Sequence, residues 1–486
     1  MKKRNEERGA VSVYLALMMA VLIPLILTMI EASRVNAIKV RMECAADLSM
    51  DSVLAEYNRE LFSQYDLLFI DTAYDGGSGS VDKLLDHLDD YMSYNLKPDK
   101  GIVSVFGKDI TGLRQDSAEI VRLSRATDEK GAVFRYMVMS SMLERYGLAY
   151  VSDVKDLVAV SSSADYNSSD VSGALGSAQG AVDGIVVPEP EPEYDEGGNE
   201  IPWEPPKKDD PAGKANAASK GVLLMQVCDG EVSGAEADLS CYASHRSLIS
   251  GDGMCEDWKP HDGLEEQLLF DEYIMEKCGN YRTQKEGSRL AYETEYIICG
   301  KNRDEANLSS IAGKLMILRG SANTIYFFGN SELQAEAKAM AAGLSFVLYM
   351  PEAEALFEIL IDMAWIYAET VYDVRTLFQG GKVPLVKQAG DWHLSLENAL
   401  GMAVSGEGEG GGRGQSYEDH LRMFLFMVPL EERTMRCMDI VEMDIRQVSG
   451  YEDFCLDNCV AGGTIQFIFC SSYGYSFLME RRFRYA

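Results

Sequence analysis

The sequence predicts an α+β chain with a single N-terminal transmembrane helix that extends into a stalk helix. A mixed, helix-rich α/β ectodomain with a C-terminal β-hairpin follows. Three observations support this fold class. Ala10–Ile30 contains no charged residue, apolar residues then continue at helical spacing to about Phe62, and aromatic alternating runs flank the turn residues Ser471–Gly474.

The apolar segment Ala10–Ile30 has the length of a membrane span. At about 1.5 Å per residue it matches the roughly 30 Å hydrocarbon core of a bilayer. The alternative is a cleaved signal, but the run passes into Glu31–Arg34 without a small-residue cleavage site. Pro24 lies inside the run, where a membrane helix tolerates it. We therefore expect the chain to contact the lipid bilayer through Ala10–Ile30.

Basic residues in the first eight positions predict the orientation. Lys2, Lys3, Arg4 and Arg8 precede the span, whereas the basic residues after it are more widely spaced. The positive-inside rule then places the N-terminus in the cytoplasm and the rest of the chain outside. The predicted localisation is the cell membrane, with a single pass and an extracellular ectodomain.

Composition and periodicity divide the chain into six segments. The acidic, proline-rich segment has few large apolar residues with which to offset its ordering entropy. The predicted segments are a cytoplasmic basic tail (1–9), the transmembrane helix (10–30), an amphipathic stalk helix (31–64), an α/β block (65–160), a disordered acidic, Pro-rich linker or insertion (161–219) and a helix-rich block with the C-terminal hairpin (220–486).

Within these blocks, hydrophobic patterns predict the individual elements. Strands are expected at 65–72, 102–107, 118–126, 221–228 and 292–300, and helices at 81–94, from Thr127, at 262–278, over most of 303–380, at 416–428 and at 431–448. Ser331 and Gln334 form a capping-box pattern, and Pro351 suits a first helical turn. The short apolar stretch 339–350 is predicted to belong to a buried helix pair rather than to a second membrane span.

The charge balance excludes some partners. The chain has 77 acidic and 45 basic residues and a formal net charge of −32. Nucleic-acid binding requires Lys and Arg to replace phosphate counterions, so we expect no nucleic acid as a partner. The same charge opposes adsorption to an anionic lipid surface. No small-molecule substrate is evident from the sequence.

Ten cysteines leave the redox state open. Cys455 and Cys459 have a spacing that fits half a metal site, a disulfide or two cysteines on one helix face. Because Cys437 and Cys470 lie nearby in sequence, a local disulfide among these four residues is the preferred interpretation.

Catalytic patterns are weak throughout. Gly406–Gly411 fits G-x-G-x-x-G, but it contains Glu407 and Glu409 and no strand precedes it. Asp439–Asp444 includes three carboxylates, which we interpret as a solvated helix face. The five histidines lack the spacing of zinc ligands. The sequence therefore predicts no enzyme, no metal and no cofactor.

The stretch "RGAVSVYLALMMAVLIPLILTMIEASR" resembles the N-terminus of TadE/TadG-type proteins, minor pseudopilin-like components of tight-adherence pilus systems. The resemblance implies processing between Gly9 and Ala10, although Tyr14 stands where processed members have Glu. It also makes Tyr14, Pro24 and Glu31 candidates for contacts between membrane helices during assembly. Because Glu31 lies at the far end of the apolar run, the preferred interpretation of Glu31 is a simple interfacial charge.

The body of the chain resembles an uncharacterised family of bacterial ectodomains, the domain-of-unknown-function family 5702. The resemblance is carried by "YETEYIICGKNRDEANL", "DVRTLFQGGKVPLVK", "SYEDHLRMFLFM" and "RCMDIVEMDIR". Together the two resemblances imply a membrane-anchored structural or accessory subunit whose partners are pilus or secretion-system proteins. The alternatives are a free-standing adhesin, sensor or envelope-binding module, and an extracellular hydrolase.

Overall fold

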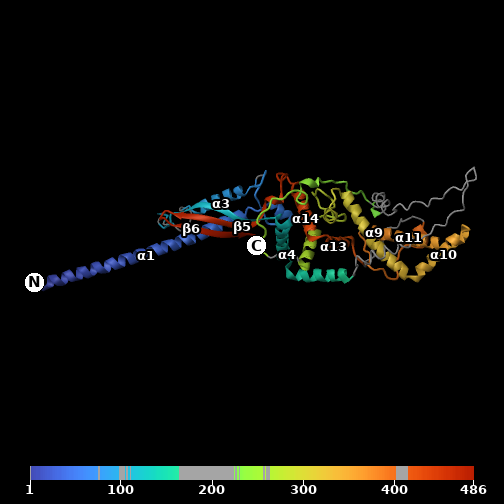
Figure 1. The fold of residues 1–486 in the computed structure, drawn as a ribbon, viewed down its shortest axis with the longest axis horizontal. Coiled ribbons are helices and arrows are strands. Elements are labelled where there is room, and N and C mark those ends of the chain that lie inside the picture. The colour runs from blue at the N-terminus through green and yellow to red at the C-terminus, as the bar shows by residue number, and fades with distance from the viewer. Residues whose placement is uncertain are drawn as a thin grey trace, which may run out of the picture. The chain divides into compact units, whose positions relative to one another are not determined.

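The computed structural model describes most of the chain, in two compact units (Figure 1). The first unit comprises residues 1–141, 246–261 and 448–486, and the second comprises 142–245 and 262–447. The described residues are 2–74, 77–97, 104–105, 108–109, 111–163, 224, 227–228, 230–255, 258, 263–400 and 414–485.

The first unit begins with one long helix, α1 (Lys2–Leu54), which runs through Pro24 without a break. Its C-terminal half is amphipathic, and the buried side chains lie three or four residues apart: Ile38, Met42, Ala45, Ala46, Met50 and Val53. The predicted continuity of membrane and stalk segments is confirmed. Among the described residues, α1 is the one helix that is long and apolar enough to cross a membrane.

The predicted extension of this helix to Phe62 is wrong. The chain leaves α1 after Leu54, and a separate helix, α2 (Arg59–Tyr65), follows. The break arises at Asn58, which has extended backbone and whose side-chain oxygen accepts a hydrogen bond from the Leu61 N–H. Asn58 is thus the N-cap of a new helix, a position that Asn strongly favours.

Antiparallel pairing around β5 (Cys459–Ser471) builds the sheet of this unit. β5 pairs with β4 (Leu113–Arg125), with β6 (Ser476–Arg484) and with the short β1 (Ile70–Asp71). The β5–β6 pair confirms the predicted C-terminal hairpin, and β4 confirms the strand predicted at 118–126. β1 covers only part of the strand predicted at 65–72, because α2 continues to Tyr65.

The core of the first unit lies where α1 and α3 (Val81–Asn95) meet this sheet. Leu84 and Leu88 of α3 approach Met50 of α1, and Ile120 and Ile465 approach from the strands. The helix predicted at 81–94 is therefore confirmed, with its apolar face inward. The remaining elements are β2 (Ser104–Val105), β3 (Lys108–Asp109), the start of α4 (Asp128–Ser163) and the 3-10 helix η3 (Leu456–Asn458).

The described part of the second unit is helical. Its helices are the C-terminal part of α4, α7 (Leu264–Lys277), α8 (Glu293–Cys299), α9 (Asp304–Gly329), α10 (Ser331–Val347), α11 (Glu354–Phe378), α12 (Leu396–Leu400), α13 (Tyr417–Met427) and α14 (Leu430–Ile445), with the 3-10 helices η1 (Leu239–Cys241) and η2 (Pro351–Ala353). α10 and α11 pack around Phe327, Ala341 and Trp365. Gly380, with φ +89°, ends the α11 segment as predicted.

Two predicted strands of this unit are wrong. The segment 292–300 forms α8 instead of a strand, because its alternation of polar and apolar residues does not reflect exposure. Glu293, Thr294 and Glu295 are as buried as the apolar residues before and after them. In the segment 221–228, the described residues Leu224 and Val227 are helical, and the Cys228 N–H donates to the Leu224 carbonyl 2.8 Å away.

The α10 region departs from prediction at both ends. Its N-cap is Asn330 rather than Ser331, since the Asn330 side chain accepts from the N–H groups of the next turn. At the other end the predicted buried helix pair is only partly formed. Small residues of α10 are buried, whereas the apolar residues 346–350 are exposed, including Phe346 and Tyr349. Pro351 opens η2, which leads directly into α11.

Two predicted segments lie mostly outside the described residues. These are the linker 161–219, apart from Ser161–Ser163 at the end of α4, and the glycine-rich stretch 406–411.

Candidate functional site

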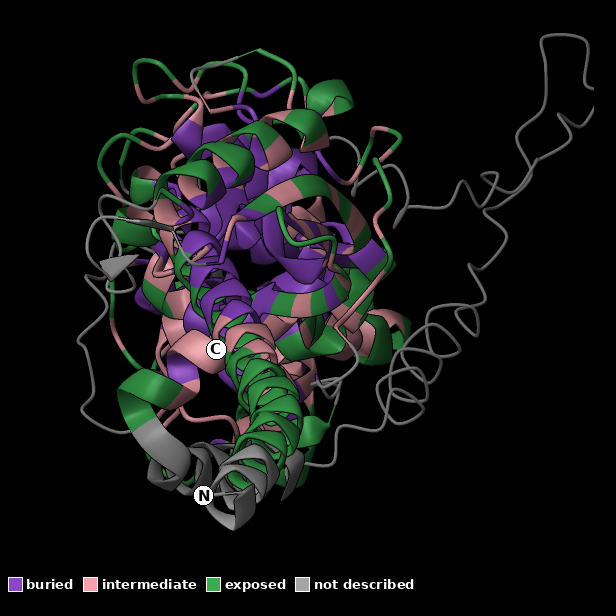
Figure 2. Ribbon diagram, turned by 90° about the vertical axis from the view of Figure 1, so that its left-hand side faces the viewer, coloured by how far each residue is buried: buried purple, intermediate pink, exposed green. Residues whose placement is uncertain are grey.

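The apolar half of α1 makes no packing contact that buries it. Every residue from Val11 to Ile30 is exposed, including the candidate assembly residues Tyr14 (67% exposed) and Pro24 (Figure 2). Gly9 and Ala10 lie within the same helix. A soluble protein does not leave so long an apolar surface in water, so this segment requires an apolar environment.

Glu31 lies directly after the apolar segment and joins α1 to the β-hairpin. The Tyr475 hydroxyl donates a hydrogen bond to the Glu31 carboxylate at 2.6 Å, and Arg34 donates to the other oxygen at 2.7 Å. The Arg34 guanidinium in turn lies 4.0 Å from the centre of the Tyr473 ring. Glu31 is therefore more than a simple interfacial charge, because it holds the turn between β5 and β6 against the helix.

Further contacts join the hairpin to α1 along its length. Arg481 of β6 forms ion pairs with Glu43 at 3.6 Å and with Asp47 at 3.4 Å. At the far end, the Tyr485 hydroxyl donates to the carbonyl of Leu54, the last residue of α1, at 2.6 Å. These contacts connect the hairpin to α1 from Glu31 to Leu54. Sequence reasoning missed this, because the partners are more than 400 positions apart.

The expected local disulfide is not formed. The structure contains no disulfide among its cysteines, including Cys437, Cys455, Cys459 and Cys470. Cys459 begins β5, and its sulfur lies 3.9 Å from the Cys455 carbonyl oxygen. Cys470 lies near the hydroxyl of Ser476, its partner in β6, and Cys437 is buried on α14. Each of these four cysteines therefore occupies a different place in the fold, and none is paired with another.

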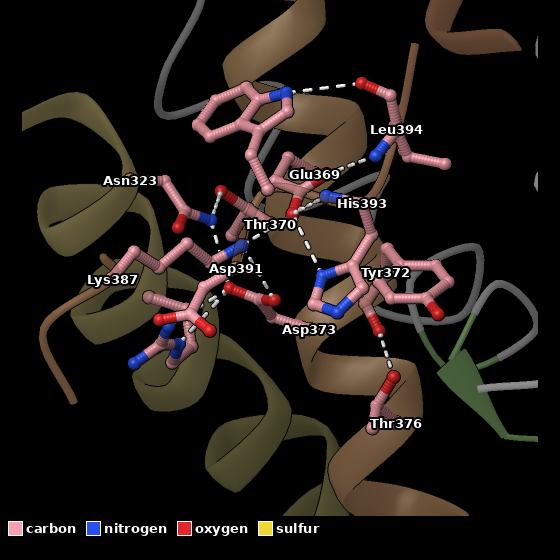
Figure 3. A network of polar contacts seen from close by, with 12 residues as sticks. Asn323, Glu369, Thr370, Tyr372, Asp373, Thr376, Lys387, Asp391, His393 and Leu394 are labelled. Carbon is pink, nitrogen blue, oxygen red and sulfur yellow. Dashed lines mark hydrogen bonds and ion pairs between the residues drawn. The ribbon is translucent and has the colours of Figure 1, made fainter. Parts of the chain in front are cut away.

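A buried ionic cluster lies in the second unit (Figure 3). Glu369 and Asp373 lie one turn apart on α11 and are fully buried. The segment after α11 supplies Lys387, whose ammonium contacts Glu369 and lies 2.9 Å from Asp373. Arg319 of α9 donates twice to Asp373, at 3.0 and 3.2 Å. The negative charges of Glu369 and Asp373 are therefore balanced by two positive charges inside the helical core.

Neighbouring polar groups complete this cluster. The backbone N–H groups of His393 and Leu394 donate to Glu369 at 3.0 and 2.9 Å. Asn323 donates to Asp373 at 3.0 Å. Burial alone would raise the pKa of Glu369, but the hydrogen bonds from His393 and the attraction to Lys387 outweigh it, so that this pKa lies below its ordinary value.

Glu369, Asp373 and His393 could also form a three-ligand metal site, because their ligand atoms all lie within 4.8 Å of one another. The Lys387 ammonium, however, contacts both carboxylates, which is where a metal ion would need to bind. With Arg319 also on Asp373, the two negative charges are already balanced. We therefore interpret this cluster as an ionic brace between α9, α11 and the segment after α11.

The three carboxylates of the segment 439–444 are buried, so their interpretation as a solvated face is wrong. Asp439 accepts hydrogen bonds from the Ser244 N–H at 2.8 Å and from the Tyr296 hydroxyl at 2.7 Å. Asp444 pairs with Lys285 at 2.8 Å. Burial raises the pKa of Asp439 despite these donors.

Two cavities of the first unit are small, with volumes of about 20 and 10 Å³. Pockets for drug-sized ligands usually measure roughly 300–1,000 Å³. Neither cavity has room for such a ligand.

Comparison with known proteins gives one match. The model of a family of unknown function, DUF5702, matches residues 202–471, which is more than half of the chain. No curated protein matches the chain. No solved structure matches it either.

Proposed function

The chain belongs to the family of unknown function DUF5702, and we propose that it is a membrane-anchored extracellular subunit with a structural or accessory role in pilus or secretion-apparatus assembly. It has no catalytic role in this proposal. The apolar half of α1 holds the subunit in the membrane beside partner helices, and the ectodomain binds envelope or pilus proteins.

The observation that carries the proposal is the continuity of α1. One helix contains both the exposed apolar half and the buried half that builds the core of the first unit. A cleaved signal would be separate from the folded body. Here a cut after Arg34 would remove Glu31 and its hydrogen bond to Tyr475. This arrangement supports a permanent anchor.

The charge distribution supports the proposed orientation. The basic residues before the apolar segment favour a cytoplasmic N-terminus. The strongly acidic remainder is suited to a soluble, self-repelling ectodomain outside the cell. The resemblance of the N-terminus to TadE/TadG-type proteins suggests which kind of assembly the subunit serves.

Complementation of a deletion strain tests the proposal with two matched variants. Val21→Arg places a charge in the middle of the apolar segment, at a cost of about 2.5–3.5 kcal/mol for membrane insertion. Val40→Arg places the same charge on the part of α1 outside that segment. Val21 and Val40 are similarly exposed, at 64% and 60%.

The expected result is that deletion abolishes surface filaments or secretion, and that Val40→Arg restores them whereas Val21→Arg does not. Alkaline extraction should release only the Val21→Arg protein from membranes. Unchanged filaments and secretion in the deletion strain would favour the free-standing surface module. Mass spectrometry of the mature N-terminus adds an independent check, since a chain that begins after Arg34 would contradict the anchor.

A further inference from the structure

The turn between β5 and β6 lies at the point where α1 changes from apolar to polar. The hairpin runs beside the C-terminal half of α1, with its turn towards the N-terminal end (Figure 1). Glu31 is the first charged residue after the apolar segment, and Tyr475 of the turn donates to it at 2.6 Å. The turn is therefore at the level at which the helix leaves its apolar environment.

The side chains of this turn and of the start of β6 have the chemistry of a membrane interface. Tyr473 is 47% exposed and Leu478 is 66% exposed, whereas Tyr475 and Phe477 are half-buried, with ring centres 6.1 Å apart. Tyrosine combines an apolar ring with a polar hydroxyl and is enriched where hydrocarbon meets headgroups. The Arg34 guanidinium beside the Tyr473 ring adds a cation that suits lipid phosphate.

We propose that the β5–β6 turn, Ser472–Tyr475, inserts into the headgroup region of the bilayer that α1 enters, with Tyr473 and Tyr475 as interfacial anchors. The inference rests on the anchoring function proposed above. The apolar segment that ends at Ile30 is about one hydrocarbon core in length, so Glu31 falls at its boundary. The hydrogen bond from Tyr475 then sets the depth of the turn.

This contact would orient the first unit relative to the membrane. A single helix can tilt and rotate, and interfacial Tyr and Arg side chains limit both motions. The turn gives the unit a second point of attachment beside the helix. Because the chain has a net charge of −32, the contact relies on ring burial in the interface rather than on attraction to anionic lipid.

Depth-dependent fluorescence quenching tests the proposal in the full chain, reconstituted in phosphatidylcholine vesicles with bromine on the acyl chains near the headgroup. Three variants place Trp in the turn, in the middle of β6 and at its end, as Tyr473→Trp, Glu480→Trp and Arg484→Trp. A strand rises about 3.3 Å per residue, so position 484 lies more than about 25 Å from the turn. The wild-type chain, with its four Trp, gives the background.

The expected result is that the added emission of Tyr473→Trp is mostly quenched, that of Glu480→Trp is quenched less, and that of Arg484→Trp is not quenched. Equal quenching at all three positions would overturn the proposal, because the hairpin would then lie flat on the membrane. No quenching at any position would also overturn it. The additional change Tyr475→Phe should reduce the quenching at position 473, since it removes the donor to Glu31.

Flotation of the vesicles separates the two proposals. A chain that floats with the vesicles but shows no quenching of Tyr473→Trp keeps its anchor and refutes only the inserted turn. A chain that does not float refutes the anchor itself and the proposed function with it. Anionic vesicles made with phosphatidylserine should give no greater quenching, and a marked increase would instead indicate electrostatic adsorption.

Discussion

Replacing Lys387 with Met would leave the buried carboxylate of Glu369 without its charge partner. Both side chains are fully buried. Asp373 would keep its ion pair with Arg319. Glu369 would keep the hydrogen bonds from the backbone N–H groups of His393 and Leu394. Breaking a buried ion pair by removing one partner costs about 3–5 kcal/mol, and these remaining donors place the expected loss near the lower end, at about 3 kcal/mol.

The pH dependence of this loss has a definite sign. In the wild type the pKa of Glu369 lies below its ordinary value of 4.5, so its contribution to stability is complete at neutral pH and is lost as the pH falls through the folded-state pKa. In Lys387→Met the attraction and hydrogen bond of Lys387 are lost while burial and the His393 donors remain, so the pKa of Glu369 is expected to rise. Protonation then relieves the penalty, so the deficit relative to the wild type should shrink between pH 7 and pH 5.

Hydrogen exchange of α11 peptides in the full chain is the appropriate assay, because a chain with two units does not have a single unfolding free energy. Lys382→Met is the matched control, since Lys382 is exposed and lies in the same segment. It should change the opening free energy by less than about 0.5 kcal/mol. A deficit below about 1 kcal/mol for Lys387→Met at pH 7, or one that does not shrink at pH 5, would refute the ionic brace.

Three further changes test other buried polar groups, each by hydrogen exchange of the helix concerned. Asp439→Ala should destabilise α14 by about 3 kcal/mol, because it leaves a partly buried N–H and a buried tyrosine hydroxyl without their acceptor, whereas Glu432→Ala on the same helix should cost less than about 1 kcal/mol. Burial lowers the pKa of His420 from its ordinary value of 6.5 to about 4, so the folded state disfavours the charged imidazole. The stability of α13 should therefore fall as the pH falls below 6.5, and His420→Gln should abolish that loss. Asn58→Ala should destabilise α2 by about 1 kcal/mol, and Asn58→Ser should preserve most of the cap without adding a charge beside Asp71.

Elements with a strong local signal could be predicted from the sequence. α1 follows from an uncharged apolar run and the helical spacing after it, both of which are properties of adjacent residues. The β5–β6 hairpin follows from alternating aromatic residues on either side of a short turn. The boundaries of helices depend on single side chains. At Asn58 and Asn330, a capping hydrogen bond decides where α2 and α10 begin.

Charged residues misled the prediction where their partners are distant in sequence. The sequence predicts a solvated Asp439, since acidic residues are rarely buried without partners. Its donors Ser244 and Tyr296 lie 195 and 143 positions away, and no local pattern reveals them. No local pattern reveals the ionic brace of Glu369 either, because Lys387 belongs to the segment that follows α11. A helix such as α8, with buried glutamates, then resembles an alternating strand.

Buried carboxyl groups also make the charge of the folded chain differ from its formal net charge. The formal value of −32 assumes that every carboxyl group is ionised. Burial raises the pKa of Asp271 to about 8, although Arg433 donates to it at 2.9 Å, and that of Glu295 to about 7, so both carboxyl groups ionise less readily in the folded chain than in the unfolded one. Such groups release protons on unfolding and favour the folded state more as the pH falls, opposite in sign to Glu369. The formal charge of −32 is therefore larger in magnitude than the charge of the folded chain at neutral pH, because the helical core encloses carboxyl groups whose pKa is raised.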